Sequence, residues 1–146
     1  MIRNDREYQE AQRRLKDDQD FIAAQHRALD DLALSADEVE RAMQPALSFH
    51  AQLVEEVEWY ERVRQRDFET IHSLKAIGRL LIAARMANGL TQQELAERLS
   101  VSQAQVSRDE RNEYHGITVE RAQLILDRLG EKLTARLDEK PLALAG

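Results

Sequence analysis

Polar side chains that can form two hydrogen bonds at once are concentrated in one short stretch. Ser102, Gln103 and Gln105 lie close together in the sequence, and Arg108 follows one helical turn later. Amide and guanidinium groups match the edges of nucleic-acid bases in the major groove with paired hydrogen bonds. The spacing therefore predicts a recognition surface at the start of a helix.

A second polar position precedes this stretch. Gln92 opens a short predicted helix, because Thr91-Gln92-Gln93-Glu94 has the form of a capping box, a hydroxyl side chain followed three residues later by Glu. The free backbone amides and the positive dipole end of a helix start favour an anion. We expect Gln92 to contact a phosphate there.

Other kinds of chemistry lack the residues they need. The chain has no cysteine, which excludes a disulfide framework, a zinc–thiolate site and a cysteine nucleophile. It contains neither a G-x-x-x-x-G-K-[ST] phosphate loop nor an H-E-x-x-H zinc helix. Its four histidines are scattered, at His26, His50, His72 and His115. We therefore expect no enzymatic activity, no metal and no cofactor.

The net charge of −6 hides an uneven distribution. Residues 1–69 carry 10 Lys and Arg against 17 Asp and Glu, a net charge of −7, whereas residues 70–146 carry 11 against 10, a net charge of +1. A DNA-binding surface needs only a local basic face, so the overall acidity does not exclude nucleic acid. The chain has no apolar run of about 18 residues and no secretory signal, so we expect it in the cytoplasm.

The composition predicts an all-α protein, because Ala, Leu, Glu, Arg and Gln dominate and only five Gly and two Pro interrupt them. Residues 1–66 are expected to form a long helical hairpin, with helix starts capped at Asn4 and Ser35 and a kink or break at Pro45. Residues spaced by three or four would line the two facing stripes, namely Tyr8, Ala11, Leu15, Asp18, Ile22, Gln25, Leu29 and Leu32, and then Val39, Met43, Ala46, His50, Leu53, Val57 and Tyr60.

Residues 67–131 are expected to form a compact domain of four or five helices. Its first helix is predicted over residues 68–88, with one apolar face made by Phe68, Ile71, Leu74, Ile77, Leu81 and Ala84. Two short helices follow, separated by a tight turn at Ser100-Val101 that Val101 would plug. This is the helix-turn-helix layout, and a last helix is predicted over residues 118–129.

The segment GLTQQELAERLSVSQAQVSR, from Gly89 to Arg108, resembles the helix-turn-helix of the XRE family, which includes the lambdoid phage repressors. The resemblance covers about residues 74–129 and implies a small helical bundle that binds DNA. It implies a phosphate contact from Gln92 and base contacts from Gln103, Ala104, Gln105, Ser107 and Arg108. The full set of expected DNA contacts adds Ser102 and Arg111.

Two positions depart from the family pattern. Ser100 stands where glycine is common, so Ser100 must accept a left-handed or adjusted turn. Asp109 stands where an apolar residue is usual, and a carboxylate there needs a partner, with Arg111, Arg121 and Tyr114 as candidates.

The run from Val106 to Ile117, after a helical N-terminal segment, also resembles HigA-type antitoxins and related regulators. That resemblance implies a repressor of its own operon that neutralises a toxin, and the acidic hairpin would suit a basic toxin. Near-palindromic operators imply a homodimer that contacts through the hairpin or the tail of residues 132–146. In the tail Leu133, Ala135 and Leu137 alternate as in an edge strand, although a short helix fits nearly as well.

Two alternatives remain open for the hairpin of residues 1–66. It binds a partner or a second copy, in which case a chain beginning near Asp67 still folds, or it only stabilises the DNA-binding domain, in which case that chain unfolds. The whole protein could also be a helical interaction module with a vestigial DNA-binding domain.

Overall fold

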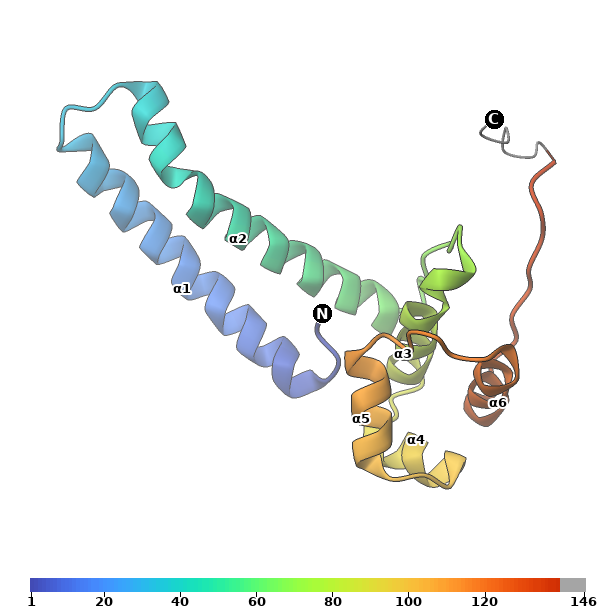
Figure 1. Cartoon of the computed structure of the whole chain (residues 1–146). Coiled ribbons are helices and arrows are strands. Elements are labelled where there is room, and N and C mark those ends of the chain that lie inside the picture. The colour runs from blue at the N-terminus through green and yellow to red at the C-terminus, as the bar shows by residue number, and fades with distance from the viewer. Residues whose placement is uncertain (140–146) are drawn as a thin grey trace.

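The computed structural model describes residues 1–139, and this part of the chain is helical without any strand. Two long helices, α1 (Asp5–Asp30) and α2 (Ala36–Arg64), form a hairpin that projects from a cluster of shorter helices (Figure 1). The cluster contains a 3-10 turn (Leu74–Ala76), α3 (Ile77–Ala87), α4 (Gln92–Leu99), α5 (Gln103–Arg111) and α6 (Val119–Leu129). The predicted all-α fold is confirmed.

The two long helices begin where their capping residues predict. The Asn4 side chain accepts a hydrogen bond from the amide of Glu7 at 2.9 Å. Ser35 forms a complete capping box with Glu38, because each side chain bonds the backbone amide of the other residue. These caps satisfy amides that have no partner inside the helix, and so fix the residue at which each long helix begins.

The facing stripes of the hairpin lie between α1 and α2 as expected. Ala11, Val39, Met43, Val57 and Tyr60 are buried, and most other members are half-buried. Leu32, at the tip, is instead exposed. The packing follows from helical periodicity, which brings every third or fourth residue onto one side.

Of the kink or break predicted at Pro45, the break is wrong, because α2 runs without interruption from Ala36 to Arg64. Proline removes only one amide donor from the helix. The turns before it are held by burial of Val39 and Met43 against α1. We infer that this packing offsets the lost hydrogen bond.

The helix predicted over residues 68–88 is also partly wrong, because α3 begins only at Ile77. Arg66 has a positive φ of 63°, and Ser73, in extended conformation, caps the 3-10 turn that follows. Phe68 still packs against the core, but from a loop, with the Arg66 guanidinium 5.5 Å from its ring centroid. Phe68 therefore fits the apolar spacing of a helix because its side chain is packed against the core, although its backbone is not helical.

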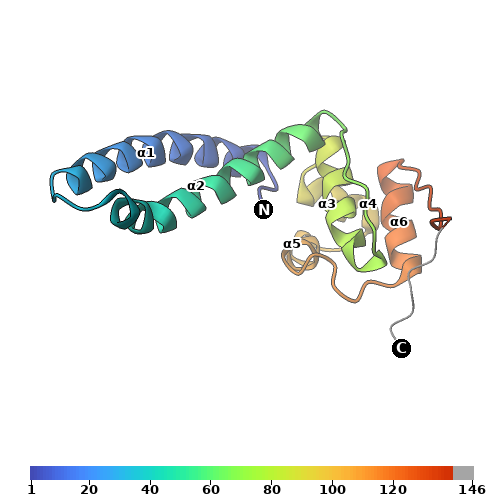
Figure 2. The same ribbon diagram turned by 90° about the horizontal axis from the view of Figure 1, so that it is seen from above.

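The base of the hairpin shares one hydrophobic core with the shorter helices. Trp59, Tyr60 and Val63 of α2 belong to the same buried cluster as Leu81 and Ile82 of α3. Figure 2 shows the C-terminal end of α2 beside α3, with the hairpin extending away from it. The long hairpin is therefore rooted in the domain that carries α4 and α5.

A close backbone approach fixes the segment that follows α5. A Cβ atom added to Gly78 in α3 would lie 1.8 Å from the carbonyl oxygen of Glu113. Only glycine allows this contact, which holds the C-terminal end of α5 against α3.

The tail forms neither the strand nor the helix that its pattern allowed, over the part that the structure describes. Residues 131–139 have no regular secondary structure, and Leu133 and Leu137 are exposed. The rest of the predicted tail, residues 140–146, lies outside the described residues.

Candidate nucleic-acid interface

The turn between α4 and α5 has the expected backbone. Ser100 adopts a left-handed conformation with φ of 56°, and the amide of Val101 donates to the carbonyl of Ala96 at 3.0 Å. Ser102 then caps α5 by accepting from the amide of Gln105 at 3.1 Å. Val101 does not plug the turn as predicted, because its side chain is 38% exposed. Backbone hydrogen bonds close the turn instead.

Burial sets the angle between α4 and α5. Leu95 and Ala96 of α4 and Val106 of α5 are fully buried where the two helices meet. The small side chain of Ala96 permits a close approach at this point. With Val106 facing inward, the opposite side of α5 faces solvent.

All the residues expected to contact DNA lie on or near this surface. Five of them are exposed: Ser102, Gln103, Ala104, Arg108 and Arg111. Three are half-buried: Gln92, Gln105 and Ser107. The structure thus brings the start of α4 and the exposed side of α5 together.

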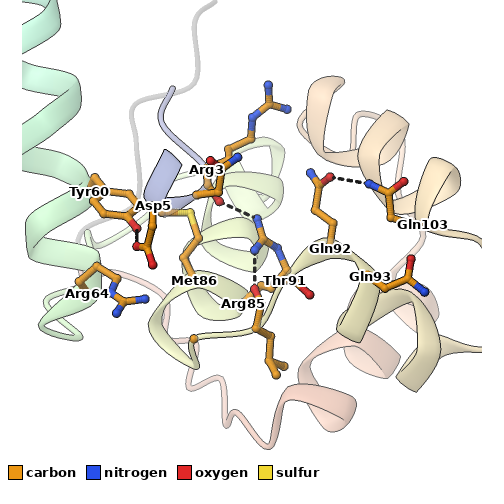
Figure 3. A pocket seen from close by; sticks show the side chains of 13 residues that line it. Arg3, Asp5, Tyr60, Arg64, Arg85, Met86, Thr91, Gln92, Gln93 and Gln103 are labelled. Carbon is orange, nitrogen blue, oxygen red and sulfur yellow. Dashed lines mark hydrogen bonds between the residues drawn. The ribbon is translucent and has the colours of Figure 1, made fainter. Parts of the chain in front are cut away.

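Hydrogen bonds between side chains orient the polar groups of this surface. The Gln103 amide donates to the Gln92 carbonyl at 3.2 Å, linking the first turns of α5 and α4 (Figure 3). Arg108 donates to the Gln105 carbonyl at 3.0 Å, and Gln105 donates to Asp109 at 2.9 Å. Side chains held in this way lose less conformational freedom when a ligand binds.

Asp109 has a partner among the three candidates. Arg121 of α6 donates to one carboxylate oxygen of Asp109 at 2.5 Å, and Gln105 donates to the other. The ion pair balances the carboxylate that stands at a usually apolar position. It also ties the middle of α5 to α6.

A buried ion pair that was not predicted from the sequence lies beneath this surface. The guanidinium of Arg85 in α3 and the carboxylate of Glu110 in α5 have side-chain exposures of 3% and 0%. Gln92 also donates to Glu110, at 2.7 Å. One signal would have revealed Glu110, because it lies four residues after Val106, on the face of α5 that points into the core.

The start of α4 is well capped. The backbone amide and hydroxyl of Thr91 both donate to the Glu94 carboxylate, at 2.7 and 2.9 Å, and lower its pKa. The Thr91 hydroxyl in turn accepts from the amide of Glu94 at 3.1 Å. The capping box leaves the first-turn amides of Gln92 and Gln93 without intrahelical acceptors, facing the end of the helix.

Residues 1–139 contain neither a metal-binding cluster nor a membrane-spanning helix. No three His, Asp or Glu side chains gather there in an arrangement that could hold a metal ion. None of the helices in this part combines the length and apolar character that crossing a membrane requires.

Comparison with known proteins identifies this part of the chain. Residues 81–135, from within α3 into the tail, match the family model described as helix-turn-helix. No curated protein and no solved structure matches the chain. The C-terminal part therefore carries a helix-turn-helix domain, and the match supports a DNA-binding transcription regulator of the XRE type.

Proposed function

We propose that the protein is a sequence-specific DNA-binding repressor that reads its operator with the exposed side of α5. The observation that supports this best is the hydrogen bond between Gln103 and Gln92, with Arg108 exposed on the same helix, α5. It places a helix start, which favours a phosphate, beside two side chains of types that read bases. Binding at a promoter would block transcription by occupying the site.

The residues of this surface divide into two proposed roles. Gln92, held by Glu110 and Gln103, would contact a backbone phosphate and set the register of the domain. Base contacts are assigned to Ser102, Gln103, Ala104, Gln105, Ser107 and Arg108. Arg111, exposed at the end of α5, would contact the backbone.

We propose that the chain binds as a homodimer. Helix-turn-helix dimers read half-sites about 34–36 Å apart, and a single domain contacts too few bases for high affinity. The exposed Leu133 and Leu137 in the extended tail are the contact we assign to the second copy.

Selection from a random duplex pool tests the DNA-binding function. We expect enrichment of a near-palindromic sequence, and a mobility shift with the DNA upstream of the protein's own gene. Recovery of no preferred sequence, with no shift, would leave the helical interaction module with a vestigial DNA-binding domain as the function.

A second candidate function concerns the middle of the hairpin. Phe21 of α1 is 61% exposed and Phe49 of α2 is 66% exposed. Phe21 directly precedes Ile22, and Phe49 directly precedes His50, and both of these belong to the facing stripes. In two antiparallel helices, positions related in this way lie on the same side of the pair. Residues 17–58 carry eleven Asp and Glu against two Arg. We propose that this acidic, aromatic surface binds a basic protein, such as the toxin of a toxin–antitoxin pair.

Co-expression with the product of the adjacent reading frame tests whether this surface binds a partner protein. We expect a complex that dissociates as salt is raised, and loss of the complex in the Phe21→Ser, Phe49→Ser double variant. Leu74→Ser, which also changes an exposed apolar residue, is the matched control and should keep the complex. If the double variant still forms the complex, this surface is not the partner-binding site. If the double variant instead loses self-association, the surface binds a second copy of the chain.

A further inference from the structure

The N-terminal segment is fastened to the DNA-binding domain through its main chain. The carbonyl of Arg3 accepts a hydrogen bond from Arg85 at 3.1 Å, and the amide of Arg3 donates to Glu7 at 2.8 Å. Ile2 is buried in the core, and the terminal amine of Met1 pairs with Glu56 at 3.1 Å. These contacts fix the position of Arg3 without using its side chain.

The Arg3 side chain lies beside the start of α4. It lines a cavity of about 400 Å³ together with Gln92, Gln93 and Gln103. Figure 3 shows the Arg3 side chain extending away from its contact with Arg85. Its Nε atom is buried and has no hydrogen-bond partner among residues 1–139. A guanidinium placed in this way has donors to offer to an incoming ligand.

The charge of the hairpin differs between its base, next to the DNA-binding domain, and its outer part. Residues 1–16 carry five Lys and Arg against three Asp and Glu, so the part of α1 next to the DNA-binding domain is basic. Most of the acidic groups lie farther out, because residues 17–51 carry eight Asp and Glu against two Arg. The two segments at the base, residues 1–16 and 52–66, together carry eight Lys and Arg against seven Asp and Glu, so the base should repel DNA little.

We propose that Arg3 is a DNA-backbone contact supplied from outside the helix-turn-helix. Its guanidinium would bind the phosphate that approaches Gln92 and the free amides of the first turn of α4. Arginine suits this role because its donors pair with two phosphate oxygens at once. The inference rests on the proposed DNA binding and adds the N-terminal segment to that surface.

The salt dependence of binding tests this contact. For full-length protein and a fixed duplex, each neutralised phosphate contributes about 0.9 to the slope of log affinity against log salt. We expect Arg3→Ala to lower that slope by about this amount and to weaken specific and non-specific binding alike. Arg3→Lys keeps the cation and should keep most of the slope. Arg27→Ala, which removes the same charge near the hairpin tip, should behave as wild type.

The outcomes separate this inference from the proposed function. A wild-type chain that binds no duplex rejects both. If wild type binds and Arg3→Ala has the same slope, DNA binding stands and the Arg3 contact is rejected. If Arg3→Lys lowers the slope of log affinity against log salt as much as Arg3→Ala does, the Arg3 side chain affects binding by supporting the fold. The phosphate contact is then also rejected. Thermal melting of each variant checks that the fold is intact. We expect it to be intact because the substitutions leave the Arg3 carbonyl, which accepts the hydrogen bond from Arg85, in place.

Discussion

The Glu110 carboxylate receives two hydrogen bonds from one guanidinium, since Nε of Arg85 lies 2.5 Å from Oε1 and Nη2 lies 2.9 Å from Oε2. Arg85 also donates to the carbonyls of Leu90 at 2.6 Å and Arg3 at 3.1 Å. The pair joins α3 to α5 and also holds Gln92 at the start of α4. Both charges are thus fully satisfied inside the core, as buried ions must be.

Removing one partner of this pair should therefore destabilise the protein strongly. We expect Glu110→Ala to lower the free energy of unfolding by about 3–5 kcal/mol, because it leaves the Arg85 charge buried and unpaired. Urea denaturation followed by circular dichroism measures the change. Glu120→Ala, which removes an exposed carboxylate at the start of α6, is the control and should shift stability little. Equal stability of both variants would contradict the importance of the pair.

Base reading by α5 should depend on its exposed side chains. We expect Gln103→Ala and Arg108→Ala each to weaken binding to the selected operator by about 1–3 kcal/mol and largely to spare non-specific binding. Footprinting and titration on operator and random duplexes measure the two affinities. Gln123→Ala changes an exposed amide on α6 and should leave both affinities unchanged. Wild-type footprints from both α5 variants would show that another element reads the bases.

The shared core makes the hairpin base essential for folding. We expect a chain beginning at Asp67 to lose its cooperative melting transition, because the buried faces of Leu81 and Ile82 lose their partners on α2. A chain in which a short Gly/Ser linker replaces residues 18–53 keeps the base and should melt cooperatively. Circular dichroism on the two chains checks this. A cooperatively folded chain from Asp67 would mean that the base contributes little.

Assembly should be visible in solution. We expect light scattering at micromolar concentration to give the mass of a dimer for the protein bound to the operator duplex. Leu133→Ser with Leu137→Ser should lower the dimer population, because both side chains lie exposed in the tail. A monomeric mass both free and on DNA would reject the homodimer.

Acid should weaken the link between α2, α3 and the tail. Partial burial raises the pKa of Glu131, but hydrogen bonds from Arg66 and Asn88 lower it by more, so it lies below its ordinary value of 4.5. A carboxyl with a lowered pKa in the folded state adds stability above its unfolded pKa, and that stability is lost as pH falls through the folded value. Unfolding free energies measured from pH 6 down to pH 3 should therefore fall less steeply for Glu131→Gln than for wild type.

Local patterns in the sequence were enough to predict most of the helices. Asn4, Ser35 and Thr91 cap helices as expected, because a cap depends only on residues three positions apart. The facing stripes of the hairpin were predictable for the same reason. A left-handed or adjusted turn at Ser100 could also be expected, because glycine, which takes a positive φ readily, is common at this position of the family pattern.

The errors came from contacts between residues far apart in the sequence. Phe68 is apolar because it packs from a loop, and its spacing imitates a helix. Arg85 and Glu110 are charged residues at core positions, which only their pairing in space explains. The position of Arg3 was equally hidden, because its main chain meets Arg85 across more than half the chain.

The length of the hairpin determines what can be bound at the same time. At about 1.5 Å per residue, the 26 residues of α1 extend about 39 Å from the base to the tip. Phe21 lies 16 residues from Asp5, about 24 Å from the base, so a molecule held at Phe21 and Phe49 would stand apart from the bases that α5 reads. The hairpin acts as a spacer, so we expect a ternary complex of DNA, regulator and partner to form without steric exclusion. Partner binding would then alter the regulator's output only through the base of the hairpin, where Arg3 and the end of α2 contact α3.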